Sequence, residues 1–153
     1  MYCQYIDSPL GPVKISATAT GISEVLFSDI QDSDRPSALT QLAAQQLQAY
    51  FSGTLLQFNL PLAASGTAFQ QQVWQALTRI AFGQTCSYAD IAKRINNEKA
   101  VRAVGAANGR NPIAIVVPCH RVIGANGTLT GYAGGLDKKA WLLKHEQRQQ
   151  ALL

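Results

Sequence analysis

The sequence of 153 residues predicts an α/β protein in which a small antiparallel sheet with one helix precedes a mainly helical part with a helix-turn-helix. Residues 1–27 hold short apolar runs separated by turn residues, which is typical of strands. From Thr67 onward the apolar residues instead recur at helical spacing. The small residues of 63–66 lie between the two patterns and have the composition of a linker. We therefore expect two domains, 1–65 and 66–153.

Three short strands are expected in the first domain, over 2–6, 13–17 and 22–27. Turn residues separate them, Asp-Ser-Pro-Leu-Gly at 7–11 and Thr-Gly at 20–21. A polar, acidic segment follows and predicts a loop. Helical spacing then predicts one helix, over 37–51, and Gly53 is placed to act as its C-cap.

The second domain is predicted to begin with a helix that has Thr67 as its N-cap and ends at Gly83. Ser87 opens the next helix, because Asp90 three residues later completes a capping box. A final helix is expected over 136–149.

The helix from Ser87 and a further helix over 98–107, joined by Asn96-Asn97, have the dimensions of a helix-turn-helix. On a helical wheel, Val101, Val104 and Gly105 share the inward face of the second helix. The outer face combines two cations with small residues that let a nucleic-acid backbone approach: Lys99, Arg102, Ala103 and Ala106. The alternative is an ordinary two-helix corner with solvated charges.

Charge is distributed unevenly along the chain. Residues 1–77 carry two Lys/Arg against five Asp/Glu, a net charge of −3, whereas residues 78–153 carry eleven against four, a net charge of +7. A basic half favours a polyanionic partner such as nucleic acid, although scattered solvated charges remain an alternative. No apolar stretch is long enough for a membrane span, and no secretory signal is visible. Three distant cysteines favour a reducing compartment, and we expect a cytoplasmic protein.

The apolar run over 113–117 predicts a buried strand, and Cys119 and His120 follow it. The ordinary thiol pKa of about 8.5 leaves little thiolate at neutral pH, so a nucleophilic Cys119 needs a base. His120 can serve only if the chain turns there, because neighbours on a strand point to opposite faces. Glu146 is a credible partner for His120, and Arg121 is expected to be structural. The alternative is that Cys119 is an inert buried thiol.

Several short motifs follow one another between Phe69 and Glu146. They are Ser87-Tyr88, Arg102-Ala103-Val104-Gly105, Asn111-Pro112, Pro118-Cys119-His120-Arg121-Val122, Tyr132 before Gly134-Gly135-Leu136, and Trp141-Leu142-Leu143 with His145-Glu146. In order and spacing they resemble the O6-alkylguanine-DNA alkyltransferases, DNA-repair proteins that accept an alkyl group onto their own cysteine. Residues before Phe69 resemble this family more weakly, by their sheet-then-helix outline.

The resemblance implies a role for each matching residue of the reacting centre. Cys119 is the expected acceptor, His120 its base through a water, and Glu146 the group that orients His120. Asn111 is expected to tie the cysteine segment to the helices. Tyr88 is expected to donate a proton to the guanine ring, which neutralises the charge on the leaving group.

The resemblance also implies a DNA interface and a base pocket. Arg102 is expected to fill the gap left by a flipped nucleotide, while four further residues contact DNA: Lys99, Ala103, Ala106 and Arg110. The pocket for the flipped base is expected to be formed by Tyr132, Val122 and Ala133.

The implied function is irreversible transfer of an alkyl group from O6 of guanine, and from O4 of thymine, in double-stranded DNA to the protein's own cysteine, with base flipping and one turnover. No cofactor and no metal are expected, and the protein is expected to be a monomer that does not bind membranes. The chain departs from many relatives at Ala133, where they carry serine, and at Ala114, where some carry proline. We also expect no counterpart of the zinc ligands that some relatives have, nor of the regulatory domain that is fused to this module in others.

Two other functions stay open at this point. The first is a DNA-damage sensor without transfer activity, although such proteins carry another residue at the position of Cys119. The second is a hydrolase with Cys119, His120 and Glu146 as a triad, which requires turnover and an oxyanion hole.

Overall fold

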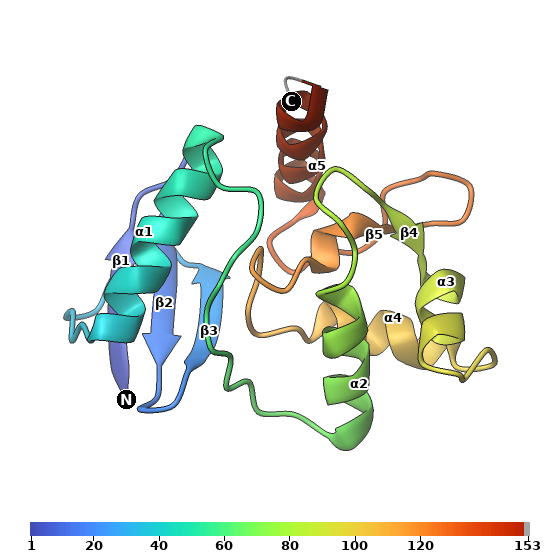
Figure 1. Cartoon of the computed structure of the whole chain (residues 1–153), viewed down its shortest axis with the longest axis horizontal. Helices are drawn as coiled ribbons and strands as arrows, with labels where there is room; N and C mark the ends of the chain where they lie inside the picture. The colour runs from blue at the N-terminus through green and yellow to red at the C-terminus, as the bar shows by residue number, and fades with distance from the viewer. Residues whose placement is uncertain (152–153) are drawn as a thin grey trace. The chain divides into compact units, whose positions relative to one another are not determined.

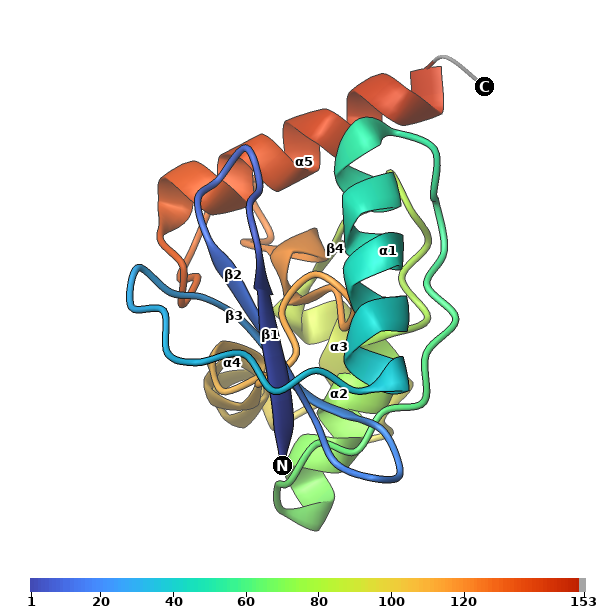
Figure 2. The same cartoon turned by 90° about the vertical axis from the view of Figure 1, so that its left-hand side faces the viewer.

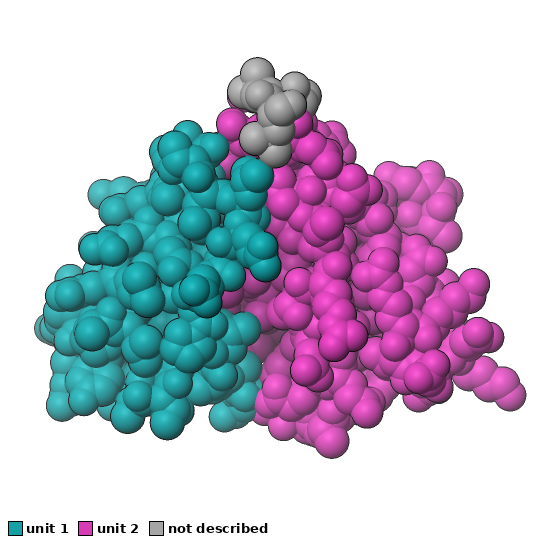
Figure 3. Space-filling view, viewed as in Figure 1, with its two compact units in different colours: residues 1–65 teal, residues 66–153 magenta. Residues whose placement is uncertain are grey.

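A computed structural model describes residues 1–151, and the chain divides into two compact units, unit 1 (Met1–Ser65) and unit 2 (Gly66–Leu153) (Figures 1 and 3). Each unit has its own buried apolar residues. The predicted fold class is confirmed: a small antiparallel sheet with one helix precedes a mainly helical part. Within residues 1–151, no helix combines the length and the apolar character that crossing a membrane requires.

The sheet of unit 1 has its strands in the order β1 (Tyr2–Ile6), β2 (Val13–Ala17) and β3 (Ile22–Phe27), all antiparallel. These bounds are the predicted ones, because each strand is delimited by its own turn residues. The central strand contributes most to the core: Val13, Ile15 and Ala17 are fully buried.

Helix α1 (Ala38–Ser52) packs along this sheet (Figure 2). It begins at a capping box in which Ser37 and Thr40 each accept the other's backbone N–H. Gly53 ends it in the left-handed conformation, with φ of 86°, which confirms the predicted C-cap. Leu47 lies on the buried face, whereas Leu42 on the same helix is 39% exposed.

Unit 2 consists of short helices joined by turns (Figure 1). Its elements are α2 (Ala68–Leu77), β4 (Cys86–Ser87), α3 (Tyr88–Arg94), α4 (Val101–Gly109), the 3₁₀ helix η1 (Cys119–Arg121), β5 (Val122–Ile123) and α5 (Leu136–Ala151). The caps predicted at Thr67 and Ser87 are both present as capping boxes. Helix α2 nevertheless ends at Leu77, well before Gly83, because the N–H groups of Arg79 and Ile80 bond to the third residue back instead of the fourth.

Helix α4 runs over Val101–Gly109, whereas the sequence predicted a helix over 98–107. Both of its ends therefore lie later in the chain than predicted. Residues before Val101 form a turn in which Ala100 N–H donates to Asn97, and Asn96 adopts a left-handed φ of 58°. The inward placement of Val101 is also wrong, since its side chain is 37% exposed. A helical side chain leans over the turn that precedes it. Val101 is the first residue of its helix and has no such turn, so its side chain stays at the surface.

Of the apolar run over 113–117, Ile113, Ile115 and Val117 are buried as predicted and Ala114 and Val116 are partly exposed, but the run is not a strand. The backbone turns within it: Val117 N–H donates to the carbonyl of Ile113, and Ile115 has a φ of +71°. That conformation is uncommon for a β-branched residue and costs about 1–3 kcal/mol, so the surrounding contacts must hold it.

A strand pair and a side-chain hydrogen bond connect segments of unit 2 that lie far apart in the chain. The short strands β4 and β5 pair in parallel, Cys86 with Val122 and Ser87 with Ile123, which places η1 beside the start of α3. The indole N–H of Trp74 on α2 donates to the carbonyl of Ala107 on α4, at 2.9 Å.

Replacement of Leu47 by Ala tests the core of unit 1. We expect Leu47→Ala to lower the free energy of unfolding by about 2–5 kcal/mol, because it leaves a cavity at a fully buried site. Leu42→Ala, on the exposed side of the same helix, is the matched control and should cost less than about 1 kcal/mol. Urea titration measures both, and equal losses would contradict the assigned buried face.

Candidate active site

Cys119 lies at a tight turn and is 6% exposed. The turn is closed by the side-chain amide of Asn111, which donates to the carbonyls of Val117 at 2.8 Å and of Ile113 at 3.3 Å, and accepts from Ile113 N–H. The chain then continues as the 3₁₀ helix η1 and not as a strand. The turn of the backbone that His120 needs in order to serve Cys119 is therefore present. Asn111 thus supports the backbone that carries the thiol.

Asn108 is a residue of this site that the sequence did not identify. It lies near the end of α4, is 3% exposed, and its amide donates to the carbonyl of Cys119 at 3.4 Å. Helix α4 therefore contacts the cysteine segment directly. The sequence did contain one signal for a buried Asn108: it comes four positions after the buried Val104 and therefore lies on the same face of the helix.

Beside Cys119 lies a buried charged cluster from η1 and α5, formed by His120, Arg121 and Glu146. His120 Nε2 is 2.6 Å from one carboxylate oxygen of Glu146. Arg121 donates to both carboxylate oxygens, at 2.8 and 3.1 Å, and to the carbonyl of Ile80 at 2.6 Å. The expected contact between His120 and Glu146 is confirmed, and Arg121 has the expected structural position.

The protonation states of this cluster follow from its contacts. Burial alone would raise the pKa of Glu146, but the hydrogen bonds and charges of His120 and Arg121 outweigh it and lower that pKa to about 2. Burial lowers the pKa of His120 below its ordinary value, against the opposing effect of Glu146. Glu146 is therefore an anion and His120 a neutral ring that donates its Nε2–H to it.

The other ring nitrogen of His120 is then an acceptor. Nδ1 is buried and has no hydrogen-bond partner among the described residues. Burial also raises the pKa of the Cys119 thiol, which a hydrogen bond with Asn111 and the charge of Lys139 only partly offset. The free protein thus holds a neutral thiol at Cys119 and, at the residue that follows it in the chain, a buried base with an unused lone pair, two groups suited to proton transfer at the moment of reaction.

Lys139 is a second residue that sequence reasoning missed. Its side chain is fully buried, and its Nζ donates to the carbonyls of Val122 and Thr130, both at 2.6 Å. Burial lowers the pKa of Lys139, and the nearby Cys119 opposes that shift. Lysine is rarely buried, and the expected helix contained two adjacent lysines, so nothing in the pattern separated this one from its neighbour.

Two of the three predicted pocket residues, Val122 and Tyr132, lie near this centre. Val122 is fully buried at the start of β5. Tyr132 is partly buried, and burial, with smaller contributions from Cys119 and Glu146, raises its pKa. Ala133 is exposed. Tyr88, the first residue of α3, is partly buried and its hydroxyl lies 2.6 Å from that of Thr130.

The predicted DNA contacts are separate from this centre and lie at the surface. Arg102, Ala103 and Ala106 are exposed on α4, and Lys99 and Arg110 are exposed just before and just after it. Tyr88 connects the two groups, because its ring lies within 4.0 Å of the position that a Cβ on Gly105 of α4 would occupy.

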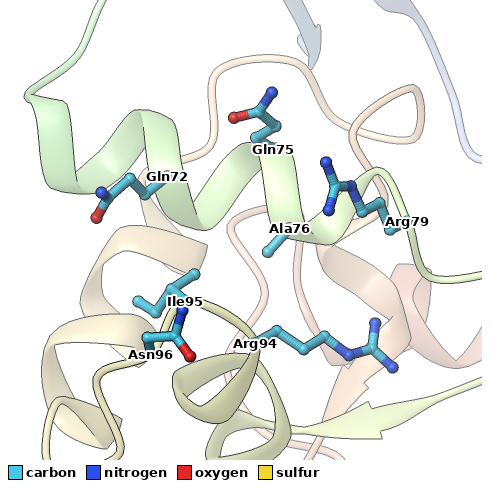
Figure 4. Close-up of a pocket in the computed structure, with 7 residues that line it drawn as sticks. All are labelled: Gln72, Gln75, Ala76, Arg79, Arg94, Ile95 and Asn96. Carbon is cyan, nitrogen blue, oxygen red and sulfur yellow. The ribbon is translucent and has the colours of Figure 1, made fainter.

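A shallow pocket of about 160 Å³ lies elsewhere in unit 2, between α2 and the end of α3 (Figure 4). Arg79 and Arg94 are among its lining residues, and it includes no residue of the Cys119 centre. Among the described residues, no group of three or more His, Cys, Asp or Glu side chains could hold a metal ion.

Comparison with known proteins gives consistent matches over nearly the whole chain. The family model for the DNA binding domain of 6-O-methylguanine DNA methyltransferase matches residues 68–148, and the model for the ribonuclease-like domain of the same family matches residues 1–64. A methylated-DNA–protein-cysteine methyltransferase of Methanosarcina acetivorans is 50% identical over 95% of this chain and 98% of its own. One from Mycobacterium leprae is 45% identical, over 97% and 94%.

A similar solved structure is that of Mycobacterium tuberculosis OGT in complex with DNA. It matches with a TM-score of 0.90 and 43% sequence identity, over 97% of this chain and 94% of that chain. An O6-methylguanine DNA methyltransferase from Methanococcus jannaschii matches with a TM-score of 0.69 and 27% identity.

The buried cluster makes stability depend on pH in a defined direction. Because the pKa of Glu146 falls from 4.5 to about 2 on folding, its contribution is complete above pH 4.5 and is lost as the pH falls toward 2. Glu146→Gln should therefore cost about 3–5 kcal/mol at pH 7, and the difference from the unsubstituted protein should shrink below pH 4.5.

Urea unfolding at a series of pH values measures this dependence. Glu24→Gln is the matched control, since Glu24 forms a half-exposed pair with Lys14 at 3.9 Å and should cost at most about 1 kcal/mol. A pH-independent difference between the unsubstituted protein and Glu146→Gln would contradict the assigned ionisation.

Proposed function

The chain belongs to the 6-O-methylguanine DNA methyltransferase family, and we propose that Cys119 is the residue to which it transfers the alkyl group. The activity of the chain is repair of alkylated DNA by transfer of the alkyl group to a cysteine of the protein itself, and its partner is DNA. What remains to be assigned is the role of each residue.

The histidine that follows Cys119 in the chain is the observation that supports Cys119 as the acceptor. The three cysteines are all free thiols, but only Cys119 is followed by a buried neutral histidine with an unused ring nitrogen. Cys3 lies in unit 1, and Cys86, although buried, has no histidine next to it in β4 or α3. His120 is therefore the available base and Cys119 the nucleophile.

In the proposed reaction, the thiol proton of Cys119 passes through a water to Nδ1 of His120. The sulfur attacks the alkyl carbon in line, the S–C bond forms, and the bond from carbon to O6 breaks with its electron pair moving onto the guanine. Glu146 stabilises the imidazolium, because it already accepts the Nε2–H at 2.6 Å. Tyr88 gives a proton to a ring nitrogen of the guanine and so neutralises the leaving group.

The thioether product is stable, and the described residues include no group that we expect to cleave it, so each molecule acts once. The reaction as written uses only side chains and one water, and it needs no cofactor or metal. O4-alkylthymine presents the same kind of carbon, bound to the oxygen of an aromatic leaving group, and we propose it as a second substrate.

Burial of Cys119 explains why the base must leave the duplex. A thiol that is 6% exposed cannot reach a carbon inside the base stack, so the alkylated nucleotide has to rotate into the protein. We propose that Arg102 occupies the space it leaves, that Ala103 and Ala106 allow close approach to the groove, and that Lys99 and Arg110 contact phosphates. Tyr132, Val122 and Ala133 form the receiving pocket.

We propose that the protein acts as a monomer. The three free thiols fit a reducing compartment, and we propose a cytoplasmic location.

Mass spectrometry of the Cys119 peptide tests the assignment. After incubation with a duplex that contains O6-methylguanine, we expect a gain of one methyl group on Cys119, stoichiometric and permanent. Cys119→Ala should bind the duplex but leave the lesion in place, whereas Cys86→Ala should accept the methyl normally. An unmodified Cys119 after the lesion is repaired would refute the assignment, and repeated turnover would favour a hydrolase.

Replacement of Arg102 tests its proposed role in base flipping. Arg102→Ala should slow methyl transfer by about 10- to 100-fold. Without the Arg102 side chain to fill the gap in the duplex, the few kcal/mol of base stacking lost on flipping are not compensated. Lys99→Ala should instead weaken binding modestly and reduce its salt dependence. Stopped-flow fluorescence of a base analogue next to the lesion separates flipping from encounter, and the control is Arg79→Ala, in the turn that follows α2. Equal effects of the Arg102 and Arg79 replacements would contradict the role of Arg102.

A further inference from the structure

Thr130 is held at two points in the loop between β5 and α5. Its hydroxyl oxygen lies 2.6 Å from that of Tyr88, and its carbonyl accepts from Nζ of the buried Lys139, also at 2.6 Å. Lys139 donates in addition to the carbonyl of Val122, so the same ammonium group connects Thr130 to the strand that follows the cysteine turn. The neighbours of Thr130 in the loop, Leu129 and Gly131, are exposed.

The hydrogen bond between Tyr88 and Thr130 can be arranged in two ways, since either hydroxyl can donate. If Tyr88 donates, its proton points at Thr130 and cannot reach a guanine. If Thr130 donates, the hydrogen of Tyr88 is left for the base in the pocket. A separation of 2.6 Å is at the short end for hydroxyl groups, so the contact constrains where the Tyr88 oxygen lies.

We propose that Thr130 is a positioning residue for Tyr88: its hydroxyl donates to the Tyr88 oxygen, directs the Tyr88 proton into the base pocket, and stabilises the phenolate that forms when that proton leaves. This inference rests on the proton-donating role proposed above for Tyr88. A hydrogen bond to a developing charge is stronger than one between neutral groups, so Thr130 contributes more in the transition state than before it.

The O–H bond of Tyr88 breaks, its proton goes to a ring nitrogen of the departing guanine, and the electron pair stays on the Tyr88 oxygen, which keeps the hydrogen bond from Thr130. The Cys119 proton ends on His120. Return of that proton through water to Tyr88 restores both groups after transfer, and no oxidant, reductant or additional reactant is consumed.

Lys139 determines how well the Thr130 hydroxyl is placed. Because the carbonyl of Thr130 is bound to a fully buried side chain of α5, the residue is fixed on one side by its backbone and on the other by its hydroxyl. Thr128 in the same loop differs: its hydroxyl is exposed and donates only to Asn126 within the turn, at 2.7 Å.

Replacement of Thr130 tests the proposal. Thr130→Val keeps the shape and removes the hydroxyl, and it should slow methyl transfer at saturating O6-methylguanine duplex by about tenfold or more while the Kd for the duplex changes less than about twofold. Thr130→Ser retains the hydroxyl and should recover most of the rate. Thr128→Val is the matched control and should react like the unsubstituted protein. Circular dichroism at each stage confirms folding, and Thr130→Ala replaces Thr130→Val if the latter does not fold.

Combination with Tyr88→Phe decides whether Thr130 acts through Tyr88. Thr130→Val should slow the reaction in the protein that has Tyr88 and have no further effect in the Tyr88→Phe protein. Equal slowing in both proteins, or equal rates for the Val and Ser variants, would overturn the proposal. A full rate for Tyr88→Phe would overturn it too, but would leave transfer to Cys119 intact. Absence of methyl on Cys119 in the unsubstituted protein would instead refute the proposed function.

Discussion

The ion pair of Arg121 and Glu146 is the interaction on which the reacting centre depends. Both side chains are buried, and the removal of two charges from water is costly unless their mutual geometry and hydrogen bonds compensate. Here Arg121 occupies both carboxylate oxygens and also binds the carbonyl of Ile80, just beyond α2. The ion pair therefore joins η1, α5 and the segment just beyond α2, and its carboxylate at the same time fixes the ring of His120.

Around this pair, the centre is organised by turns. Asn111 closes the turn that presents Cys119, and Asn108 at the end of α4 reaches the carbonyl of the same residue. The helix proposed to lie against DNA is thus bonded to the backbone that holds the nucleophile. Binding energy from the DNA interface can consequently be used to align the thiol and the flipped base, as differential binding of the transition state requires.

Sequence reasoning succeeded where structure is local. The three strands of unit 1 and the caps at Thr67 and Ser87 follow from neighbouring turn and capping residues, and the structure has them as predicted. Ser37 was expected to be the first residue of its helix, whereas it is the N-cap that precedes α1. The contact between His120 and Glu146 was also accessible, because the basic half contains few acids.

The failures concern side-chain contacts with the backbone and a helix start without a capping side chain, which the pattern of residue types does not reveal. The turn at Ile115 is imposed by the Asn111 amide and by burial, against the β preference of the run itself, so its apolar pattern indicated a strand. Lys139 could not be distinguished from an exposed lysine, because its partners Val122 and Thr130 are carbonyls, which leave no mark in a sequence. The late start of α4 reflects the absence of a capping side chain at Ala100.

The two residue pairs between β4 and β5 have a consequence for how this chain can change in evolution. Tyr88 directly follows one of these strands and η1 directly precedes the other, so the pairing of Cys86 with Val122 sets the spacing between proton donor and nucleophile. A single inserted or deleted residue between Cys119 and Val122, or between Cys86 and Tyr88, would shift that register and reverse the side-chain directions. Length variation is tolerable instead in the exposed turn around Gly127, where nothing in the reacting centre is displaced.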